Sequence, residues 1–305
     1  MPPSPSLRTR VASCVQQDAR CLHGVHARST ARVRTGPFTR FEPCGGPHGP
    51  LYGSLIGVEP RVRSVARAFD LLELFDHRRP HLRLKEIAEL SGLPKTTAVR
   101  LLADLVERGV VAISPDGHYT VGATLLGWVR LSATLWRVDE QTTEVMRELV
   151  HRHGETVNVY VRQDLTRVSI AQEEGTATVR NVVEVGRPMP LTAGAASYVL
   201  LAANPEVVDR LVAADPELDG GRLRERVAGA ARNGYAISDG DREIGAAAAA
   251  VAVHSRRDGR VLAALSMSGP SSRFTGERRE AGLAGLRAAA RTVSDAGMGH
   301  VEGLL

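Results

Sequence analysis

The sequence predicts a chain of the α+β class, in which a small helical unit with a two-stranded hairpin precedes a larger unit of strands and helices. Three observations lead to this prediction. Residues 84–107 contain two amphipathic helical patterns separated by a glycine turn. Residues 110–121 read as a β-hairpin around Ser114-Pro115-Asp116-Gly117. From residue 156 onward, short strand patterns accompany helical patterns, which is typical of a sheet covered by helices.

The first two patterns together predict a helix-turn-helix motif with a wing. Each helix buries one face; the apolar positions are Leu84, Ile87, Ala88 and Leu90 in Leu84–Ser91, then Ala98, Leu101, Leu102 and Leu105 in the second helix. Gly92 supplies the turn, Pro94 suits the first turn of the second helix because its φ is fixed, and Gly109 caps the end. The strands Val110–Ile113 and His118–Val121 then form the wing.

The exposed face of the second helix suits duplex DNA. That face carries Lys95, Thr96, Thr97, Arg100 and Asp104. A major groove admits one helix, and Thr and Arg side chains can bond base edges and phosphates. We therefore expect Thr96, Thr97 and Arg100 to face the groove, with Lys95 and the wing near His118 on phosphates. The alternative is a winged helix that binds only proteins, in which Lys95 and Arg100 form a solvated face.

The net charge of +5 is unevenly distributed along the chain. Residues 1–57 hold seven Arg and two acidic residues, or +5; residues 58–137 hold twelve basic and nine acidic residues, or +3; residues 138–305 hold twenty and twenty-three, or −3. Residues 1–57 are rich in Pro, Gly, Ser and Arg and lack apolar periodicity, so they are predicted to be a disordered tail. The informative asymmetry is a basic winged helix joined to a slightly acidic remainder.

The sequence gives little indication of a metal site, a bound cofactor or a membrane-spanning segment. The cysteines and the histidines near them all lie in the tail: Cys14, Cys21, Cys44, His23, His26 and His48. Their spacing is looser than a metal site requires, so we expect no metal and no cofactor. No apolar run is long enough to span a bilayer, and a soluble, cytoplasmic protein is expected. An Arg-rich, acid-poor start is also compatible with a transit peptide, although a loose extension is the simpler interpretation.

Further helices are predicted on both sides of the winged motif. The pattern of Arg61–Arg78 places Val62, Val65, Phe69, Leu72 and Phe75 on one face, which would complete a three-helix core. Ala123–Leu135 connects the two units, with Trp128 on it and Trp136 directly after it. An amphipathic connector must bury its apolar stripe somewhere, so we expect it to pack against a second copy of the chain. Helix Glu140–His153 follows and ends at Gly154.

Residues 156–302 are predicted to form an antiparallel sheet with helices packed on it, a common way to build a small-molecule pocket. Strands are expected at Thr156–Arg162, Leu165–Ala171, Ala177–Val185, Ala246–His254 and Arg260–Ser268. Helices are expected at Ala195–Ala203, Pro205–Ala213, Arg222–Arg232 and Glu277–Ala296.

Residues 58–296 resemble the IclR family of bacterial transcription regulators. The segments SGLPKTTAVRLLADLVERG, MPLTAGAASYVLLA, NGYAISDGDREIG and ALSMSGP carry the resemblance and occur in the family's order. The resemblance implies a winged helix-turn-helix DNA-binding domain at 58–122, a linker helix at 123–137 used in dimerisation, and a GAF-like effector-binding domain at 138–305. It also implies homodimers or tetramers on palindromic double-stranded operators, acting as repressors or activators, with a repressor favoured here.

The same resemblance implies which residues contact a small organic effector. They are Ala195, Ala196, Ser238, Asp239, Ala248, Ser266 and Ser268. Family proteins often have His at the position of Thr192 and Gly-Lys at Ser197-Tyr198. Ser266 and Ser268 occupy alternate strand positions, so both hydroxyls can reach one ligand, with plain sheet packing as the alternative. The run Ala246–Ala250 replaces bulkier residues, which suggests a larger or more apolar effector.

An enzyme that processes small molecules and carries an appended winged helix is the alternative from another class. Asp239, Asp241 and Glu243 cluster in sequence, and His254 lies on a nearby strand. No nucleophile elbow, phosphate loop, dinucleotide fingerprint or metal spacing accompanies them. The sequence therefore favours a regulator without catalytic residues.

Overall fold

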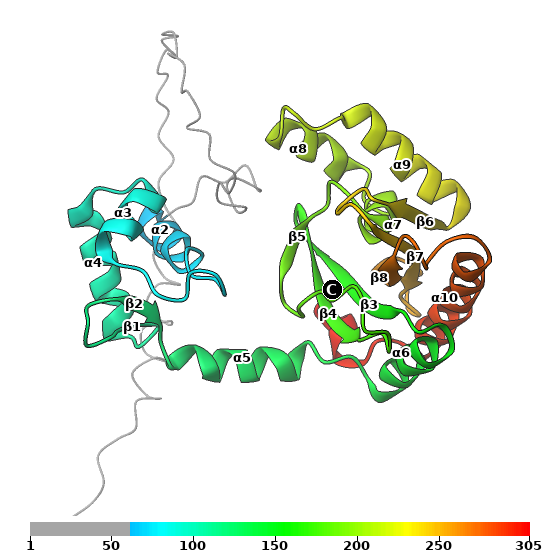
Figure 1. The fold of residues 1–305 in the computed structure, drawn as a ribbon, viewed down its shortest axis with the longest axis horizontal. Coiled ribbons are helices and arrows are strands. Elements are labelled where there is room, and N and C mark those ends of the chain that lie inside the picture. The colour runs from blue at the N-terminus through cyan, green and yellow to red at the C-terminus, as the bar shows by residue number, and fades with distance from the viewer. Residues whose placement is uncertain (1–61) are drawn as a thin grey trace, which may run out of the picture. The chain divides into compact units, whose positions relative to one another are not determined.

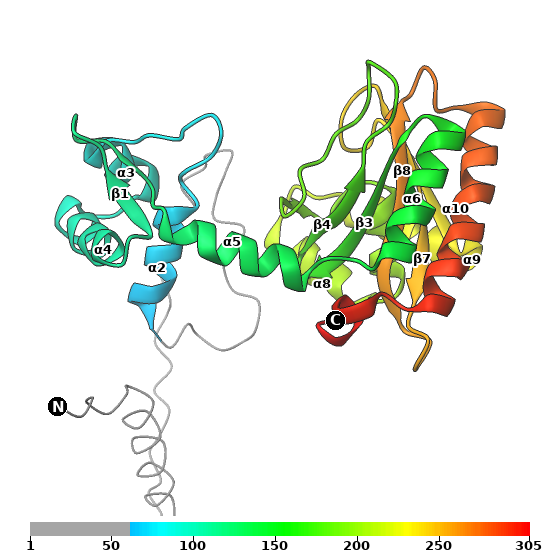
Figure 2. The same cartoon turned by 90° about the horizontal axis from the view of Figure 1, so that it is seen from below.

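A computed structural model describes residues 62–305 (Figures 1 and 2). The predicted disordered tail and its cysteines lie outside these residues. The first elements are α2 (Arg63–Leu72), α3 (Leu84–Ser91), α4 (Lys95–Glu107), β1 (Val111–Ile113) and β2 (Tyr119–Val121). Strands β1 and β2 pair antiparallel, with Val111 opposite Val121. This is the helix-turn-helix with a wing that the sequence predicts.

Glycines shape both ends of this motif. Gly92 follows α3 with a φ of 65°, the left-handed conformation that L side chains rarely adopt. At the other end, the backbone of Gly122 lies against the carbonyl group of Gly109, and a side chain on Gly122 would overlap that group. The Gly122 N–H donates to the carbonyl oxygen of Val110 at 2.7 Å. The wing is therefore held closely against the end of the second helix.

The packing of α2 differs from the prediction in its length and in its buried face. The helix ends at Leu72 rather than Arg78, because Asp76 accepts hydrogen bonds from the backbone N–H groups of Arg78 and Arg79 and forms a turn. Leu71 is fully buried in the three-helix core with Ile87, Leu102 and Val111, and Ala68, Leu72 and Phe75 pack beside it. The predicted core residues Val62, Val65 and Phe69 are more than half exposed, and Leu90 of α3 is exposed as well. Helix α2 carries two apolar stripes, and one core can bury only one of them.

Helix α5 (Thr124–Leu135) leads from the winged motif into the larger unit. The helices of that unit are α6 (Glu140–His153), α7 (Ala195–Ala202), α8 (Glu206–Ala214), α9 (Gly220–Asn233) and α10 (Gly276–Ala296), with the 3-10 helix η2 (Gly299–Gly303). Its strands are β3 (Thr156–Gln163), β4 (Thr166–Glu173), β5 (Pro188–Pro190), β6 (Tyr235–Asp239), β7 (Ala246–His254) and β8 (Val261–Pro270). They form one antiparallel sheet in the order β5-β4-β3-β8-β7-β6.

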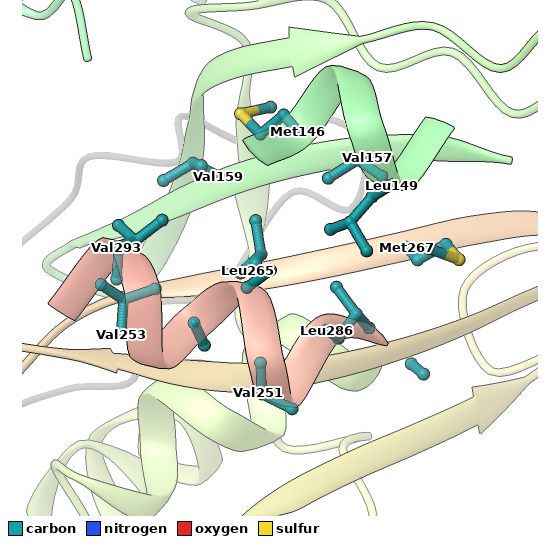
Figure 3. Packing of buried hydrophobic residues seen from close by; sticks show 14 of the residues in the cluster. Met146, Leu149, Val157, Val159, Val251, Val253, Leu265, Met267, Leu286 and Val293 are labelled. Carbon is teal, nitrogen blue, oxygen red and sulfur yellow. The ribbon is translucent and has the colours of Figure 1, made fainter. Parts of the chain in front are cut away.

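Helices cover both faces of this sheet. Helices α6 and α10 lie on one face (Figure 2), and Met146 and Leu149 of α6 and Leu286 and Val293 of α10 point at the strand residues beneath them (Figure 3). On the other face, α7, α8 and α9 bury a second core that includes Tyr198, Leu211, Val227 and Ala250. Because successive strand residues point to opposite faces, each central strand contributes to both cores.

One predicted strand is absent, and two strands were not predicted. Residues 177–185 form an irregular segment between β4 and β5 rather than a strand. The segment is rich in valine, but only Val183 is buried, whereas Val179, Val182 and Val185 are exposed. Arg180 bonds to Glu174, and Asn181 accepts a hydrogen bond from Arg242. The strands β5 and β6 were not predicted; β5 has only three residues, two of which are prolines, which is too short for a period-two pattern. No helix among residues 62–305 is long and apolar enough to cross a membrane.

Candidate nucleic-acid interface and ligand pocket

The N-terminal half of α4 presents the side chains that the sequence predicts for DNA contact. Lys95, Thr96 and Arg100 are exposed, and Thr97 is half-buried. Among the described residues, neither Lys95 nor Arg100 forms an ion pair. The apolar residues Ala98, Leu102 and Leu105 on the opposite side are buried, which fixes the helix on the core. A cationic, hydroxyl-bearing helix face is therefore available to a partner.

His118, the predicted phosphate contact of the wing, is engaged within the motif. Its Nε2 accepts a hydrogen bond from Arg83 Nε at 3.1 Å. Its Nδ1 lies 2.8 Å from a carboxylate oxygen of Asp116. A hydrogen bond from Ser114 is the main reason that the pKa of Asp116 is lowered. His118 therefore holds the wing turn and Arg83 together.

A small pocket lies between α7 and the sheet, and it collects six of the seven residues predicted to contact an effector. They are Ala195, Ala196, Ser238, Ala248, Ser266 and Ser268, all of which line the pocket. Ser238, Ala248 and Ser268 are direct cross-strand partners on β6, β7 and β8 and form one row across the sheet. The cavity has a volume of about 30 Å³.

Asp239 lies outside the pocket. Its Oδ1 accepts a hydrogen bond from Ser271 Oγ at 2.6 Å, and its Oδ2 lies 3.8 Å from Arg279. Ser238 and Asp239 are consecutive strand residues and so point to opposite faces of the sheet. Only Ser238 faces α7, where its Oγ accepts the N–H of Ala195 at 3.1 Å.

The alanine run of β7 does not form a single wall. Ala246, Ala247 and Ala248 line the pocket, but Ala247 is also buried with Ala249 in the core beneath α6 and α10. The suggestion of a larger or more apolar effector rested on the alanine run alone; the rest of the lining includes the polar residues Arg167, Arg242, Tyr160 and Asn181, with Gly194.

Arg167 is the most unusual residue of this site. It lies on β4 with 4% of its surface exposed, and Nη1 donates to the carbonyl oxygen of Ala193 at 2.7 Å and to Ser197 Oγ. Its guanidinium lies over the ring of Tyr160, with its central carbon 5.3 Å from the ring centroid. Burial, which disfavours the charged form, lowers the pKa of Arg167 to about 10, so the group still carries its charge at neutral pH.

Arg167 was not among the predicted contacts. The signal that could have found it is an arginine within the apolar strand pattern Leu165–Ala171, because buried arginine is rare without a partner. Ser197 and Tyr198, the positions at which this chain departs from the family's Gly-Lys, are both engaged nearby. Ser197 meets Arg167, and the Tyr198 hydroxyl donates to Asp241 Oδ2 at 2.9 Å.

The acidic residues considered for an enzyme do not converge. The Asp241 side chain is buried against Arg222 and Arg226, at 3.3 and 3.6 Å, whereas the Glu243 side chain is 72% exposed. His254 lies seven residues along β7 from Ala247, the partner of Asp239, or roughly 23 Å away at the usual strand rise. Residues 62–305 also contain no cluster of three His, Cys, Asp or Glu side chains that could hold a metal ion.

A wider hollow of about 570 Å³ lies beside α3 in the winged motif, lined by residues that include Arg79, Glu86, Glu89 and Leu90. It carries charges of both signs and none of the converging hydroxyl and backbone groups found beneath α7. We therefore regard the smaller pocket as the candidate ligand site.

Comparison with known proteins identifies the class of this chain. Residues 64–113 match the family model of the IclR helix-turn-helix domain, and residues 133–295 match that of the bacterial transcriptional regulator IclR C-terminal domain. The chain therefore belongs to the IclR family of transcriptional regulators.

Curated relatives and solved structures agree with this assignment. The chain is 30% identical to the transcriptional repressor AllR of Klebsiella pneumoniae over 258 residues, or 78% of this chain and 92% of that protein. It is 29% identical to the regulator KipR of Bacillus subtilis over 232 residues, or 72% of this chain and 91% of that protein.

Among solved structures, an IclR-family protein from Rhodococcus sp. is 43% identical, with a TM-score of 0.54, and the match covers 78% of this chain and 95% of that one. An IclR homologue from Microbacterium hydrocarbonoxydans, solved in complex with 4-hydroxybenzoate, is 25% identical with a TM-score of 0.61 and covers 76% of this chain and 97% of that one.

Proposed function

We propose that this protein is a transcriptional repressor that binds a palindromic operator through α4 and changes its operator affinity when a small organic effector enters the pocket beneath α7. The observation that carries the proposal is the presence of two separate sites in one chain. The first is an exposed cationic helix face on a winged motif, and the second is a pocket lined by hydroxyl, backbone N–H and guanidinium groups.

For the DNA contact, we assign base reading to Thr96, Thr97 and Arg100 and phosphate contact to Lys95. The exposure of Lys95, Thr96 and Arg100 and the buried opposite face of α4 support this assignment. The wing contact is reassigned in part: both ring nitrogens of His118 face protein partners, so Arg83 beside it is the stronger candidate for a phosphate. Residues 58–122 would then act as the DNA-binding domain and residues 138–305 as the effector-binding domain.

A palindromic operator requires two copies of the winged motif, and the apolar surface of α5 supports a homodimer or a dimer of dimers. Trp128 is 57% exposed, and Leu126, Val129 and Leu131 are exposed beside it. The unburied stripe of α2, comprising Val62, Val65 and Phe69, adds further apolar surface. Exposed apolar patches of this kind mark protein interfaces.

We propose no catalytic activity for this chain, because its relatives are transcriptional regulators and the acidic residues near the pocket are separated from one another. The 4-hydroxybenzoate bound by the M. hydrocarbonoxydans homologue supports a small organic effector here. An effector changes DNA affinity only if it binds one arrangement of the dimer better than another. Action on bacterial DNA also makes the cytoplasm the proposed location.

Footprinting on the DNA upstream of the protein's own gene tests this proposal. The full chain should protect two half-sites related by a two-fold axis, and its affinity should fall steeply with salt concentration. A screen of metabolites should then identify a compound that releases or tightens the complex. A protein that protects no DNA and shows no salt-dependent affinity would instead be the protein-binding scaffold that the sequence left open.

A further inference from the structure

Lysine is rare in this chain, and both lysines lie in the helix-turn-helix motif. Only two of the 39 basic residues are lysines, namely Lys85 on α3 and Lys95 on α4. Every one of the twenty basic residues between positions 138 and 305 is an arginine. The chemistry that distinguishes a lysine side chain from an arginine side chain is therefore confined to this motif.

That chemistry is acylation. Both side chains bind phosphates through a positive charge, but the guanidinium group of arginine always stays protonated, whereas the amine of lysine is a nucleophile once it is neutral. Acylation converts the lysine amine into an uncharged amide, which no longer binds a phosphate as a cation. A lysine at a DNA-contacting position is thus a positive charge that a chemical reaction can remove.

Lys95 is better placed for such a reaction than Lys85. Its side chain is exposed at the first position of α4, it forms no ion pair among the described residues, and the first turn of α4 contains no acidic residue. Lys85 is also exposed, but its Nζ lies 3.8 Å from a carboxylate oxygen of Glu89. An ammonium group held by a carboxylate must give up that contact, as well as a proton, before its nitrogen can attack an acyl group.

The position of Lys95 also makes its charge important for DNA binding. Lys95 begins the helix whose exposed face carries Thr96 and Arg100. Ala98 and Leu102 on the opposite side are buried and hold this helix on the core. Loss of one phosphate contact lowers the salt exponent of DNA binding by about 0.9, which corresponds to about fivefold in affinity at about 0.15 M monovalent salt.

We propose that Lys95 is an acylation site and that its acylation weakens operator binding without involving the ligand pocket. The neutral Nζ attacks the carbonyl carbon of an acyl phosphate or an acyl thioester. A C–N bond forms and the C–O or C–S bond breaks; phosphate or thiolate leaves with the bonding electron pair, and the proton of the amine passes to water. The inference rests on the proposed DNA-binding role of α4.

The first test measures where the full-length chain is acylated. The protein is incubated with acetyl phosphate in one arm and with acetyl-coenzyme A in the other, and mass spectrometry follows acetylation at each lysine. Lys95 should react about twofold or more faster than Lys85, the ratio expected when only Lys85 must break a surface ion pair. The arm that reacts identifies the class of donor. No acetylation of Lys95 in either arm, or a rate at Lys95 no higher than that at Lys85, overturns the proposal.

The second test measures whether acylation changes operator binding. Treatment with the reactive donor should lower the operator affinity of the wild type by about fivefold for each chain bound, and the salt exponent by about 0.9. Lys95→Arg is charged but is not acylated, so treatment should not change whatever affinity this variant has beforehand. The matched control, Lys85→Arg, should respond like the wild type. Lys95→Gln lacks the charge, so it should bind like the treated wild type and should not respond to treatment.

Operator footprints recorded on the same proteins distinguish this inference from the proposed function. A normal footprint and affinity that survive complete acylation of Lys95 refute the inference and leave the regulator intact. A loss of affinity that persists in treated Lys95→Arg shows that another group carries the effect and also refutes it. If the untreated protein protects no DNA, the proposed function fails and the effect on operator binding fails with it, whereas the mass spectra still decide whether Lys95 is acylated.

Discussion

The hydroxyl oxygen of Ser238 accepts a hydrogen bond from the backbone N–H of Ala195 at 3.1 Å and so joins the edge strand β6 to the first turn of α7. Both residues are buried, and both line the ligand pocket. The side chain that caps the helix thus also forms part of the binding surface, and this contact couples the position of α7 to the sheet.

Replacing Ser238 by Ala should destabilise the protein by about 1–3 kcal/mol, because the buried N–H of Ala195 loses its acceptor. Urea denaturation followed by circular dichroism measures the change. The matched control is Ser266→Ala, which removes a hydroxyl that donates to the Ala249 carbonyl oxygen, a group that also belongs to the sheet. Ser266→Ala should lower the free energy of unfolding by less than Ser238→Ala does. Equal losses would show that the hydrogen bond from Ala195 to Ser238 contributes no more than an ordinary buried hydroxyl.

Replacing Arg100 by Ala should weaken operator binding by about 1–3 kcal/mol if Arg100 contacts a base. Arg100 is exposed on the face of α4 that is free of protein contacts, so its removal should leave the Tm unchanged. Lys85→Ala on α3 is the control, since Lys85 is also exposed and forms only a 3.8 Å surface pair with Glu89. An Arg100→Ala protein with an unaltered footprint and affinity would refute the assignment.

The two tryptophans of the connector should behave differently when replaced by Ala. Trp128 is 57% exposed, whereas Trp136 is half-buried and packs on the core beneath α6 and α10. Trp128→Ala should weaken the free energy of dimerisation, by about 2 kcal/mol if Trp128 lies at the centre of the interface. The Tm of the folded unit should not fall. Trp136→Ala should lower the Tm and leave dimerisation intact. Sedimentation equilibrium and calorimetry separate the outcomes.

Replacing Ala248 by Phe should abolish the response to the effector and preserve operator binding without it. The cavity of about 30 Å³ cannot hold both a phenyl ring and a ligand. Overpacking also costs about 1–3 kcal/mol of stability, so the control is Ala252→Phe on the same face of β7, which packs in the same core outside the pocket lining. Ligand titrations of both variants decide the matter: a normal effector response in Ala248→Phe places the pocket elsewhere.

Acid should destabilise the protein partly through His153. Burial, and secondarily the charge of Arg152, lowers the pKa of His153 in the folded state, and its Nε2 has no hydrogen-bond partner among the described residues. The unfolded chain therefore binds a proton more readily, and stability is lost as the pH falls through the ordinary histidine value of about 6.5 toward the lower folded value. His153→Gln should lose less stability than the wild type between pH 7 and pH 5.5. The control is His151→Gln, because His151 is exposed on the same helix two residues earlier. This variant should lose as much stability as the wild type over the same pH range.

Features set by local sequence were predictable. The turn at Gly92, the helix over residues 95–107 and the hairpin around Gly117 depend on backbone preferences and short-range periodicity, and all three are present. The buried face of α2 was not predictable in the same way. Residues Val65 and Leu71 are equally apolar, and only the position of α3 and α4 decides which of them is buried.

The ligand pocket was predicted by resemblance, and its errors have a physical reason. Ser238 and Asp239 are adjacent, so a shift of one residue reverses which side chain faces the pocket. Arg167 was missed because its partners, Ala193 and Ser197, lie 26 and 30 residues further along the chain. No local pattern reveals that a strand arginine meets a helix terminus so distant in sequence.

Strand β7 separates two tasks along a single stretch of chain. Its even-numbered alanines, Ala246 and Ala248, border the pocket, and its odd-numbered alanines, Ala247 and Ala249, pack beneath α6 and α10, although Ala247 also reaches the pocket lining. Substitutions at the first pair reshape the space offered to a ligand while the opposite core keeps its composition. Substitutions at alternate positions of this one strand can therefore change which ligand fits during evolution, and the core on the other face of the sheet need not change.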